Sequence, residues 1–261
     1  MRLIYAMLLF AVFGCNNKEE KKEAMNMPGA YNMLSQTLND GKKDREYHNT
    51  QLKIYTGDFM MYAHINSPDS LSGFGIAAYS ADTGIITEHT VFHASPAAAD
   101  STPATYGLHI ETTSKGFKQV IPELQDEGRK IKLTEEYEAV GDTMKTALDG
   151  AWKLTASYSI KGTDTAWDKI TQYKTYYAGH FIFGHTFTDS AGKYHSGIGF
   201  GTFMMNGPNK VKESITVSTY YEIRGKTVDI DIEMNGADEF KQTITNPGGT
   251  KNIELYRRLK K

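Results

Sequence analysis

The stretch Val228-Asp229-Ile230-Asp231-Ile232-Glu233-Met234 alternates strictly between apolar and acidic side chains. Successive side chains of a β-strand point to opposite faces, so this pattern predicts a strand with one buried face and one solvated face. The first half shows the same alternation, with Tyr106, Leu108 and Ile110 on the inner face. We expect the acidic stripe to be a solvated face, because one strand face cannot supply the about six to eight oxygen ligands of calcium.

Other segments follow the same two-residue period and are separated by turn signals such as Asn246-Pro247-Gly248-Gly249. Further strands are predicted at residues 181–187, 195–205, 211–221, 240–245 and 252–259. About eight short antiparallel strands in each half indicate a meander that closes into a barrel, which removes its exposed edges. The predicted fold class is therefore all-β.

Blocks of sequence recur in the same order in the two halves of the chain, which indicates an internal duplication. The matching blocks are residues 29–31 with 150–152, 51–55 with 172–176, 57–59 with 179–181, 72–76 with 196–200, 117–121 with 240–244, and 131–133 with 253–255. The predicted domains are residues 28–140 and 148–261, joined by a linker at 141–147. Each half has the size of an independent domain.

The N-terminus has the features of an export signal at residues 1–14. Arg2 precedes a short apolar stretch, and Gly14 precedes Cys15, the single cysteine. A helix rises 1.5 Å per residue, so this stretch cannot cross a hydrocarbon core of about 30 Å. The sequence Val12-Phe13-Gly14-Cys15 resembles a bacterial lipobox. That resemblance implies cleavage before Cys15 and attachment of lipid to it, which would anchor the protein to a membrane.

Residues 15–27 are predicted to form a solvated tether, because residues 18–23 are all charged and lack apolar periodicity. Such a charged run resembles the surface-export signal of Bacteroidota lipoproteins. Asn16 is not the aspartate that commonly retains lipoproteins at the inner membrane. These features favour the outer membrane, and its external face over the periplasmic one. The alternative is that the charges only keep a linker soluble.

The composition excludes several classes of function. A formal charge of -2 leaves no electrostatic footprint for nucleic acid. Lipidation would consume the single cysteine, so no disulfide or cysteine metal site is expected. The 16 Tyr and 24 Gly against 7 Pro favour strands and turns.

Gly150 and Trp152 on the first strand of the second half, with Arg257 on its last strand, resemble the lipocalin/calycin barrel. The resemblance implies that the arginine lies across the tryptophan at the closed end of the barrel. Arg257 is the expected partner, and Arg258, on the opposite face of the strand, is the weaker candidate. Taken together, the halves resemble the two-domain lipocalin-like lipoproteins of Bacteroidota, a family of unassigned function.

The first half departs from this signature. Tyr31 stands in place of the tryptophan, and Glu135 aligns with Arg257 in the sequence blocks above. The first barrel is therefore expected to close differently from the second.

Inward polar residues recur in both halves. Glu213 shares a face with Ile215 and Tyr221, and Gln242 lies on an apolar face of its own strand. The counterparts in the first half are Glu88 and Gln119. Buried polar groups are costly unless they are paired. They therefore either orient the polar end of a ligand or bond one another across a filled barrel.

His185 and His195 fall on neighbouring predicted strands and could ligate a metal or haem. The first half does not repeat this pair, so packed or surface histidines are expected, with no metal and no cofactor. No local nucleophilic arrangement is visible, so no enzymatic activity is expected.

The leading functional hypothesis is non-catalytic binding of a small, partly apolar ligand at the cell envelope. The expected lining residues of the second barrel are Phe181, Phe183, Phe200, Glu213, Tyr221 and Gln242. The rival hypothesis is a solid interaction module that binds a glycan or an outer-membrane protein through the loop at 94–104 and through Tyr176, Tyr177 and Tyr220. The second half is expected to hold the pocket and the first half the interaction surface.

Overall fold

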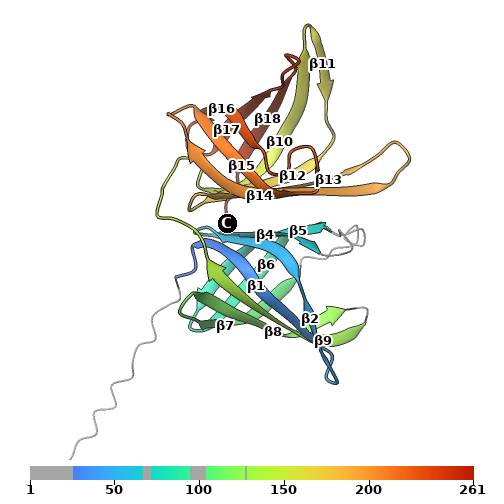
Figure 1. The fold of residues 1–261 in the computed structure, drawn as a ribbon, viewed down its shortest axis with the longest axis vertical. Helices are drawn as coiled ribbons and strands as arrows, with labels where there is room; N and C mark the ends of the chain where they lie inside the picture. Colours follow the sequence, from blue (N-terminus) through green and yellow to red (C-terminus); the bar gives the residue numbers. More distant parts are fainter. Residues whose placement is uncertain (1–25, 67–71, 95–103, 127) are drawn as a thin grey trace, which may run out of the picture.

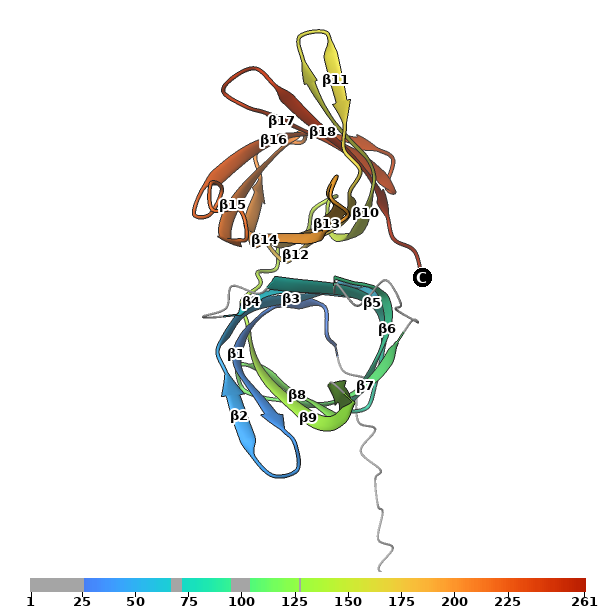
Figure 2. The same ribbon diagram turned by 90° about the vertical axis from the view of Figure 1, so that its right-hand side faces the viewer.

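The computed structural model describes residues 26–66, 72–94, 104–126 and 128–261. The export signal, Cys15, nearly all of the tether and most of the loop at 94–104 lie outside these ranges. The described residues form two closed, eight-stranded antiparallel barrels in tandem (Figures 1 and 2). The all-β prediction and the two-barrel prediction are confirmed.

Barrel 1 contains β1 to β9 and barrel 2 contains β10 to β18. In each, a nine-stranded sheet closes by pairing its first strand with its last, and the short second strand extends the first strand as a hairpin. The strands of barrel 1 are β1 (Gly29–Asn39), β2 (Asp44–Tyr47), β3 (Asn49–Tyr55), β4 (Phe59–Asn66), β5 (Ser72–Asp82), β6 (Ile85–His93), β7 (Thr105–Thr112), β8 (Gly116–Asp126) and β9 (Arg129–Ala139). Those of barrel 2 are β10 (Gly150–Lys161), β11 (Asp164–Trp167), β12 (Thr171–Tyr177), β13 (His180–Thr188), β14 (Tyr194–Met205), β15 (Lys210–Ser218), β16 (Thr227–Asn235), β17 (Glu239–Thr245) and β18 (Lys251–Arg258).

The two barrels share their strand register. Tyr31 pairs with Lys53 as Trp152 pairs with Lys174. The first strand of each barrel carries an irregularity at the same place, between Met33 and Ser35 and between Leu154 and Ala156. Such bulges bend a strand and increase its twist, which helps a sheet to close. The equivalence of the registers supports the duplication that the sequence blocks indicate.

The barrels pack against each other through β3, β4 and β5 on one side and β12, β13 and β14 on the other (Figure 2). Apolar side chains of both barrels form one buried cluster there, which includes Ile54, Phe74, Ile182 and Phe200. The ring of Phe74 lies over Gly184, where no side chain intervenes. The facing strands are therefore buried on both sides, against the barrel interior and against the other barrel.

Candidate functional site

The inner face of β3 carries Gln51, Lys53 and Tyr55, at every second residue, and all three side chains are buried. Leu52 and Ile54, between them, point outward into the contact between barrels. Strand β12 repeats the inner set as Gln172, Lys174 and Tyr176, and its outward residues also join that contact. Each barrel therefore places polar side chains inside and apolar side chains outside at this strand, because the other barrel covers the outer face.

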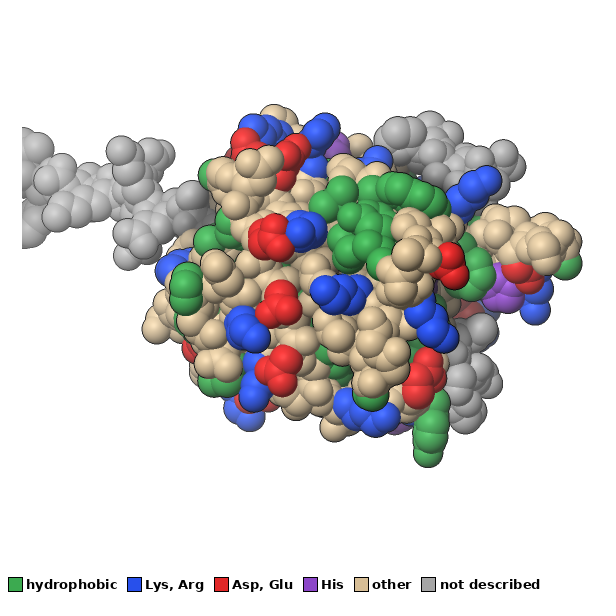
Figure 3. Space-filling model, turned by 90° about the horizontal axis from the view of Figure 1, so that it is seen from above, with side chains coloured by type: hydrophobic (Ala, Val, Ile, Leu, Met, Phe, Trp, Pro, Cys, Tyr) green, Lys and Arg blue, Asp and Glu red, His purple; other side chains and the backbone are tan. Residues whose placement is uncertain are grey.

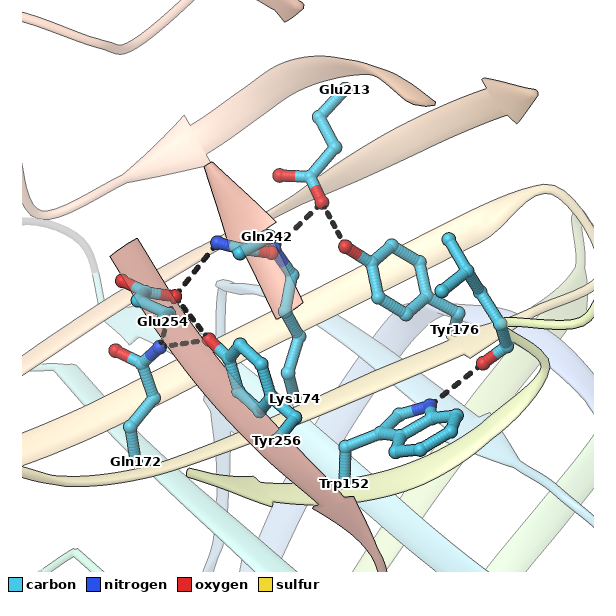
Figure 4. Close-up of polar contacts among 9 residues, drawn as sticks. Trp152, Gln172, Lys174, Tyr176, Glu213, Gln242, Glu254 and Tyr256 are labelled. Atoms are coloured by element: carbon cyan, nitrogen blue, oxygen red, sulfur yellow. Dashed lines mark hydrogen bonds and ion pairs between the residues drawn. The ribbon is translucent and has the colours of Figure 1, made fainter. Parts of the chain in front are cut away.

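In barrel 2 these side chains meet residues of β15, β17 and β18 in a buried network (Figure 4). Lys174 Nζ lies 2.7 Å from Glu213 Oε1, and Tyr176 donates to the same carboxyl oxygen. Gln242 donates to Glu254 at 2.7 Å. Glu254 also accepts from the hydroxyl of Tyr256 and from Gln172. The polar groups of this network satisfy one another, as buried polar groups usually do.

Barrel 1 holds a similar network, in which the contact between lysine and glutamate differs. Glu135 accepts hydrogen bonds from Gln119 at 2.9 Å, Tyr137 at 2.8 Å and Gln36 at 2.8 Å. Lys53 Nζ donates to Gln119 Oε1 at 2.9 Å but lies 3.9 Å from Glu88 Oε1. The distance between the lysine and glutamate side chains is therefore longer in barrel 1 than in barrel 2.

Burial shifts the pKa of a glutamate in each network and of two histidines in barrel 1. It raises the pKa of the Glu88 carboxyl, which the nearby Lys53 ammonium offsets only in part. Burial likewise raises the pKa of Glu254 in barrel 2. Burial lowers the pKa of His64 and of His93, so both imidazoles are held in the neutral form.

An interior cavity of about 230 Å³ lies in barrel 1 beside this network. Its polar wall includes Lys53, Glu88, Gln119 and Glu135, and its apolar and aromatic wall is formed by Met60, Tyr62, Ile76, Ala77, Phe92, Tyr106, Ile121, Leu124 and Leu133. The sequence analysis expected the pocket in the second half, whereas this cavity belongs to the first.

Two positions beside this network carry larger side chains in barrel 2. The strand register matches Met60 with Phe181 and Thr90 with Ile215. Phe181 and Ile215 are both buried in the core of barrel 2. The two barrels therefore share a polar network but differ in the side chains beside it.

The closed end of barrel 2 has a tryptophan under an arginine, but the arginine is Arg258 rather than Arg257. The guanidinium of Arg258 lies 4.0 Å from the centroid of the Trp152 ring. It also donates to the carbonyl oxygens of Ala147 and Ala237. Arg257 points outward and pairs with Glu239. The prediction was wrong because Glu254, Tyr256 and Arg258 form the inner face of β18, so the residues between them face outward.

The same register corrects the sequence alignment of the last strands. Glu135 corresponds to Glu254, since each pairs across strands with Gln119 or Gln242. Ala139 takes the place of Arg258 opposite Tyr31. Tyr31 nevertheless keeps one feature of Trp152, because each side chain donates to a backbone carbonyl four residues earlier, at Met27 and Leu148.

The predicted lining residues of barrel 2 occupy different surroundings. Phe181 is buried in the barrel core, and Phe183 is partly buried against that core. Phe200 points out of the barrel into the contact between barrels. Tyr221 is 84% exposed, because β15 ends at Ser218 and the chain turns there. Phe200 and Tyr221 are therefore removed from the set, whereas Glu213, Gln242, Glu88 and Gln119 all belong to the two buried networks.

The lysines and tyrosines of these networks were missed by the sequence analysis. A usable signal was present, because Gln, Lys and Tyr recur at every second residue in the matching blocks 51–55 and 172–176. A polar set kept on one strand face in both copies indicates an inner network. Leu52 and Ile54 obscure this signal, because they form an apolar face on the opposite side of the same strand.

The histidines do not form a metal site. His185 bonds Gln172 and the hydroxyl of Tyr220, and burial lowers its pKa to about 4. His195 instead pairs with Asp189. Across the described ranges, no group of His, Cys, Asp and Glu side chains could hold a metal ion. Within those same ranges, no helix has the length and hydropathy to cross a bilayer.

The acidic stripe of β16 is solvated and paired with lysines on the neighbouring strands. Lys210 lies 3.2 Å from Asp231, and Lys241 lies 2.7 Å from Glu233. Figure 3, which views the barrel 2 end of the molecule, shows acidic and basic side chains interspersed over this surface. Exposed pairs of this kind contribute little to stability.

These features define the protein as a tandem pair of antiparallel barrels with similar buried polar networks and a cavity beside the network of barrel 1. No protein-family model and no curated protein matches the chain. The chain is similar to a redesigned β-barrel, with 18% identity and a TM-score of 0.31, over 46% of this chain and 99% of that one. It is also similar to a double mutant of the vaccine antigen transferrin binding protein B from Haemophilus parasuis Hp5. That match has 13% identity and a TM-score of 0.25, and it covers 85% of this chain and 56% of that one.

Proposed function

We propose that the protein binds a small, partly apolar ligand inside barrel 1 and performs no reaction on it. The cavity of about 230 Å³ carries this proposal, because an apolar wall meets a few buried polar groups there. Ligand sites commonly have this composition. A protein cavity of about 150 Å³ accepts benzene, so this one has room for a ring with a short polar chain.

The N-terminal sequence supports a location for this binding at the cell envelope. Lipid on Cys15 would tether the barrels to a membrane, and residues 16–27 would separate them from its surface. The outer membrane, with its external face favoured, remains the proposed site of action.

Substituting barrel 2 residues into barrel 1 tests the cavity directly. The double variant Met60→Phe, Thr90→Ile is expected to fill the space, as Phe181 and Ile215 do in barrel 2. The protein is titrated with 2-phenylethanol while methyl signals are followed by NMR. In the unmodified protein, the methyl groups of Ile121 and Leu133 should shift, and those of Ile230 and Ile232 should not. The double variant should lose these shifts; unchanged binding by the filled variant would contradict the proposal.

The rival function, an interaction module, is favoured by a different observation. Trp167 on β11 is 67% exposed, and its ring lies 4.7 Å from that of Tyr158 on the adjacent strand. An exposed tryptophan backed by a partly buried tyrosine on a protruding hairpin could serve as a platform for a glycan ring (Figure 1). Tyr176, proposed earlier for this role, is fully buried.

On this alternative, Trp167→Ala should abolish binding on a glycan array, whereas Tyr47→Ala on the matching hairpin of barrel 1 should not. If no signal on the array depends on Trp167, the interaction-module alternative is contradicted.

A further inference from the structure

The carboxyl group of Glu88 is buried but has fewer partners than its counterpart Glu213. Glu88 is 5% exposed. Glu213 receives both Lys174 at 2.7 Å and Tyr176 on one oxygen. In the described part of the chain, the one hydrogen bond to Glu88 comes from Tyr55, at 2.9 Å on Oε1. The other oxygen is left without a partner in a side chain that lines the cavity.

The charges around the cavity do not balance. One ammonium, Lys53, faces the carboxyl groups of Glu88 and Glu135. Three side chains donate hydrogen bonds to the carboxyl group of Glu135. Burial raises the pKa of Glu88, which favours the protonated form of this carboxyl in the empty barrel. The titratable groups that surround it are Lys53 and Tyr55 on β3, Tyr62 and His64 on β4, His93 on β6, Tyr106 on β7, and Glu135 and Tyr137 on β9.

The remaining wall favours a cation over an anion. His64 and His93 line the cavity as neutral imidazoles, so they add no positive charge. Lys53 already donates to Gln119. Tyr62 and Tyr106 also line the cavity, and aromatic rings attract cations. With a proton on Glu88 these groups carry no net charge, so a bound anion would add an uncompensated negative charge, whereas a bound cation would take the place of that proton.

We propose that barrel 1 selects a ligand whose polar end is an ammonium group, and that this group pairs with the free oxygen of Glu88. The ammonium takes the place of the proton on Glu88, which passes to the solvent. The apolar end of the ligand, about one ring in size, lies against Ile121, Leu124 and Leu133. This inference rests on the proposed function, because it requires the cavity of barrel 1 to be a ligand site.

Three probes of similar size and different charge separate the two proposals. 2-Phenylethylammonium, 2-phenylethanol and phenylacetate are each titrated into the protein at pH 7 by calorimetry. The ammonium should bind about tenfold or more tightly than the alcohol, since a hydrogen bond to a charged group is stronger than a neutral one. Phenylacetate should bind most weakly. Equal or tighter binding of the alcohol or phenylacetate overturns the ammonium inference alone; failure of all three to bind overturns the proposed function with it.

A variant and a pH series assign the effect to Glu88. Glu88→Gln should remove the preference for ammonium over alcohol, while Glu111→Gln, on the exposed face of β7, should keep it. The far-UV spectrum checks that both variants are folded. In the unmodified protein, affinity for the ammonium should rise with pH as Glu88 loses its proton, with proton release visible in buffers of different ionisation enthalpy. An affinity independent of pH, without proton release, would contradict the pairing even if the variant failed to fold.

Discussion

Replacing Lys174 with methionine is expected to destabilise barrel 2 by about 3–5 kcal/mol. The Lys174 and Glu213 side chains are 3% and 4% exposed and lie 2.7 Å apart. Removing the ammonium leaves the carboxylate buried without its compensating charge, and this penalty exceeds the net contribution of the pair itself. Urea unfolding followed by tryptophan fluorescence measures the effect, because both tryptophans, Trp152 and Trp167, belong to barrel 2.

Two controls distinguish this explanation from a loss of packing. The double variant Lys174→Met, Glu213→Gln should recover most of the lost stability, because no charge then remains unpaired. The matched variant Lys53→Met in barrel 1, followed by circular dichroism, should cost less, since Lys53 lies 3.9 Å from Glu88 beside a cavity. Equal losses of stability for Lys53→Met and Lys174→Met would show that the short ion pair between Lys174 and Glu213 is not the cause.

Replacing Trp152 with alanine should also cost about 3–5 kcal/mol, the usual range for removing a large buried aromatic side chain. Trp152 is fully buried, and its ring packs edge-on against Phe240 at 4.7 Å. Its indole nitrogen donates to the Leu148 carbonyl at 2.7 Å, and Arg258 covers its face. The substitution therefore leaves a cavity, an unpaired carbonyl and a guanidinium without its aromatic partner. Urea unfolding followed by circular dichroism measures the loss.

Graded variants separate these contributions. Trp152→Phe keeps a ring beneath the guanidinium but loses the hydrogen bond, so it should cost less than Trp152→Ala. Arg258→Ala should also destabilise the barrel, whereas Arg257→Ala should be nearly neutral, because Arg257 forms an exposed pair with Glu239. A larger loss for Arg257→Ala than for Arg258→Ala would contradict the observed orientation of β18.

The orientations of β16 and β18 show where the alternation of residues predicts the inner face of a strand and where it does not. At β16 the alternation of acidic and apolar residues matches the two faces of the strand. The acidic face meets solvent, and Ile230 and Ile232 lie in the barrel core. At β18 the alternation is weak, and the residues next to Ile253 and Leu255 include a buried glutamate that bonds Gln242. The apolar residues of β18 therefore predict the wrong inner face, and this prediction gives Arg257 the role that Arg258 has in the structure.

Local turn geometry accounts for the error at Tyr221. The alternation of residues 211–221 continues past the last strand residue, Ser218, and gives no sign of the end of β15. The Ser218 hydroxyl accepts the amide hydrogen of Tyr220, and Arg224 donates to the Ser218 carbonyl. These bonds turn the chain away from the barrel.

The sequence by itself determined the all-β class, the duplication and the presence of inward glutamate and glutamine in both halves. Each of these follows from the alternation of side chains along a strand or from repeated residues. Only the tertiary structure decided which face of β3 and β12 points inward and which barrel has a cavity. The face depends on the second barrel, which buries Leu52 and Ile54 from outside and leaves Lys53 to the interior. The cavity depends on how much space the side chains of several strands fill together. The alternation of residues along any one strand does not predict this space.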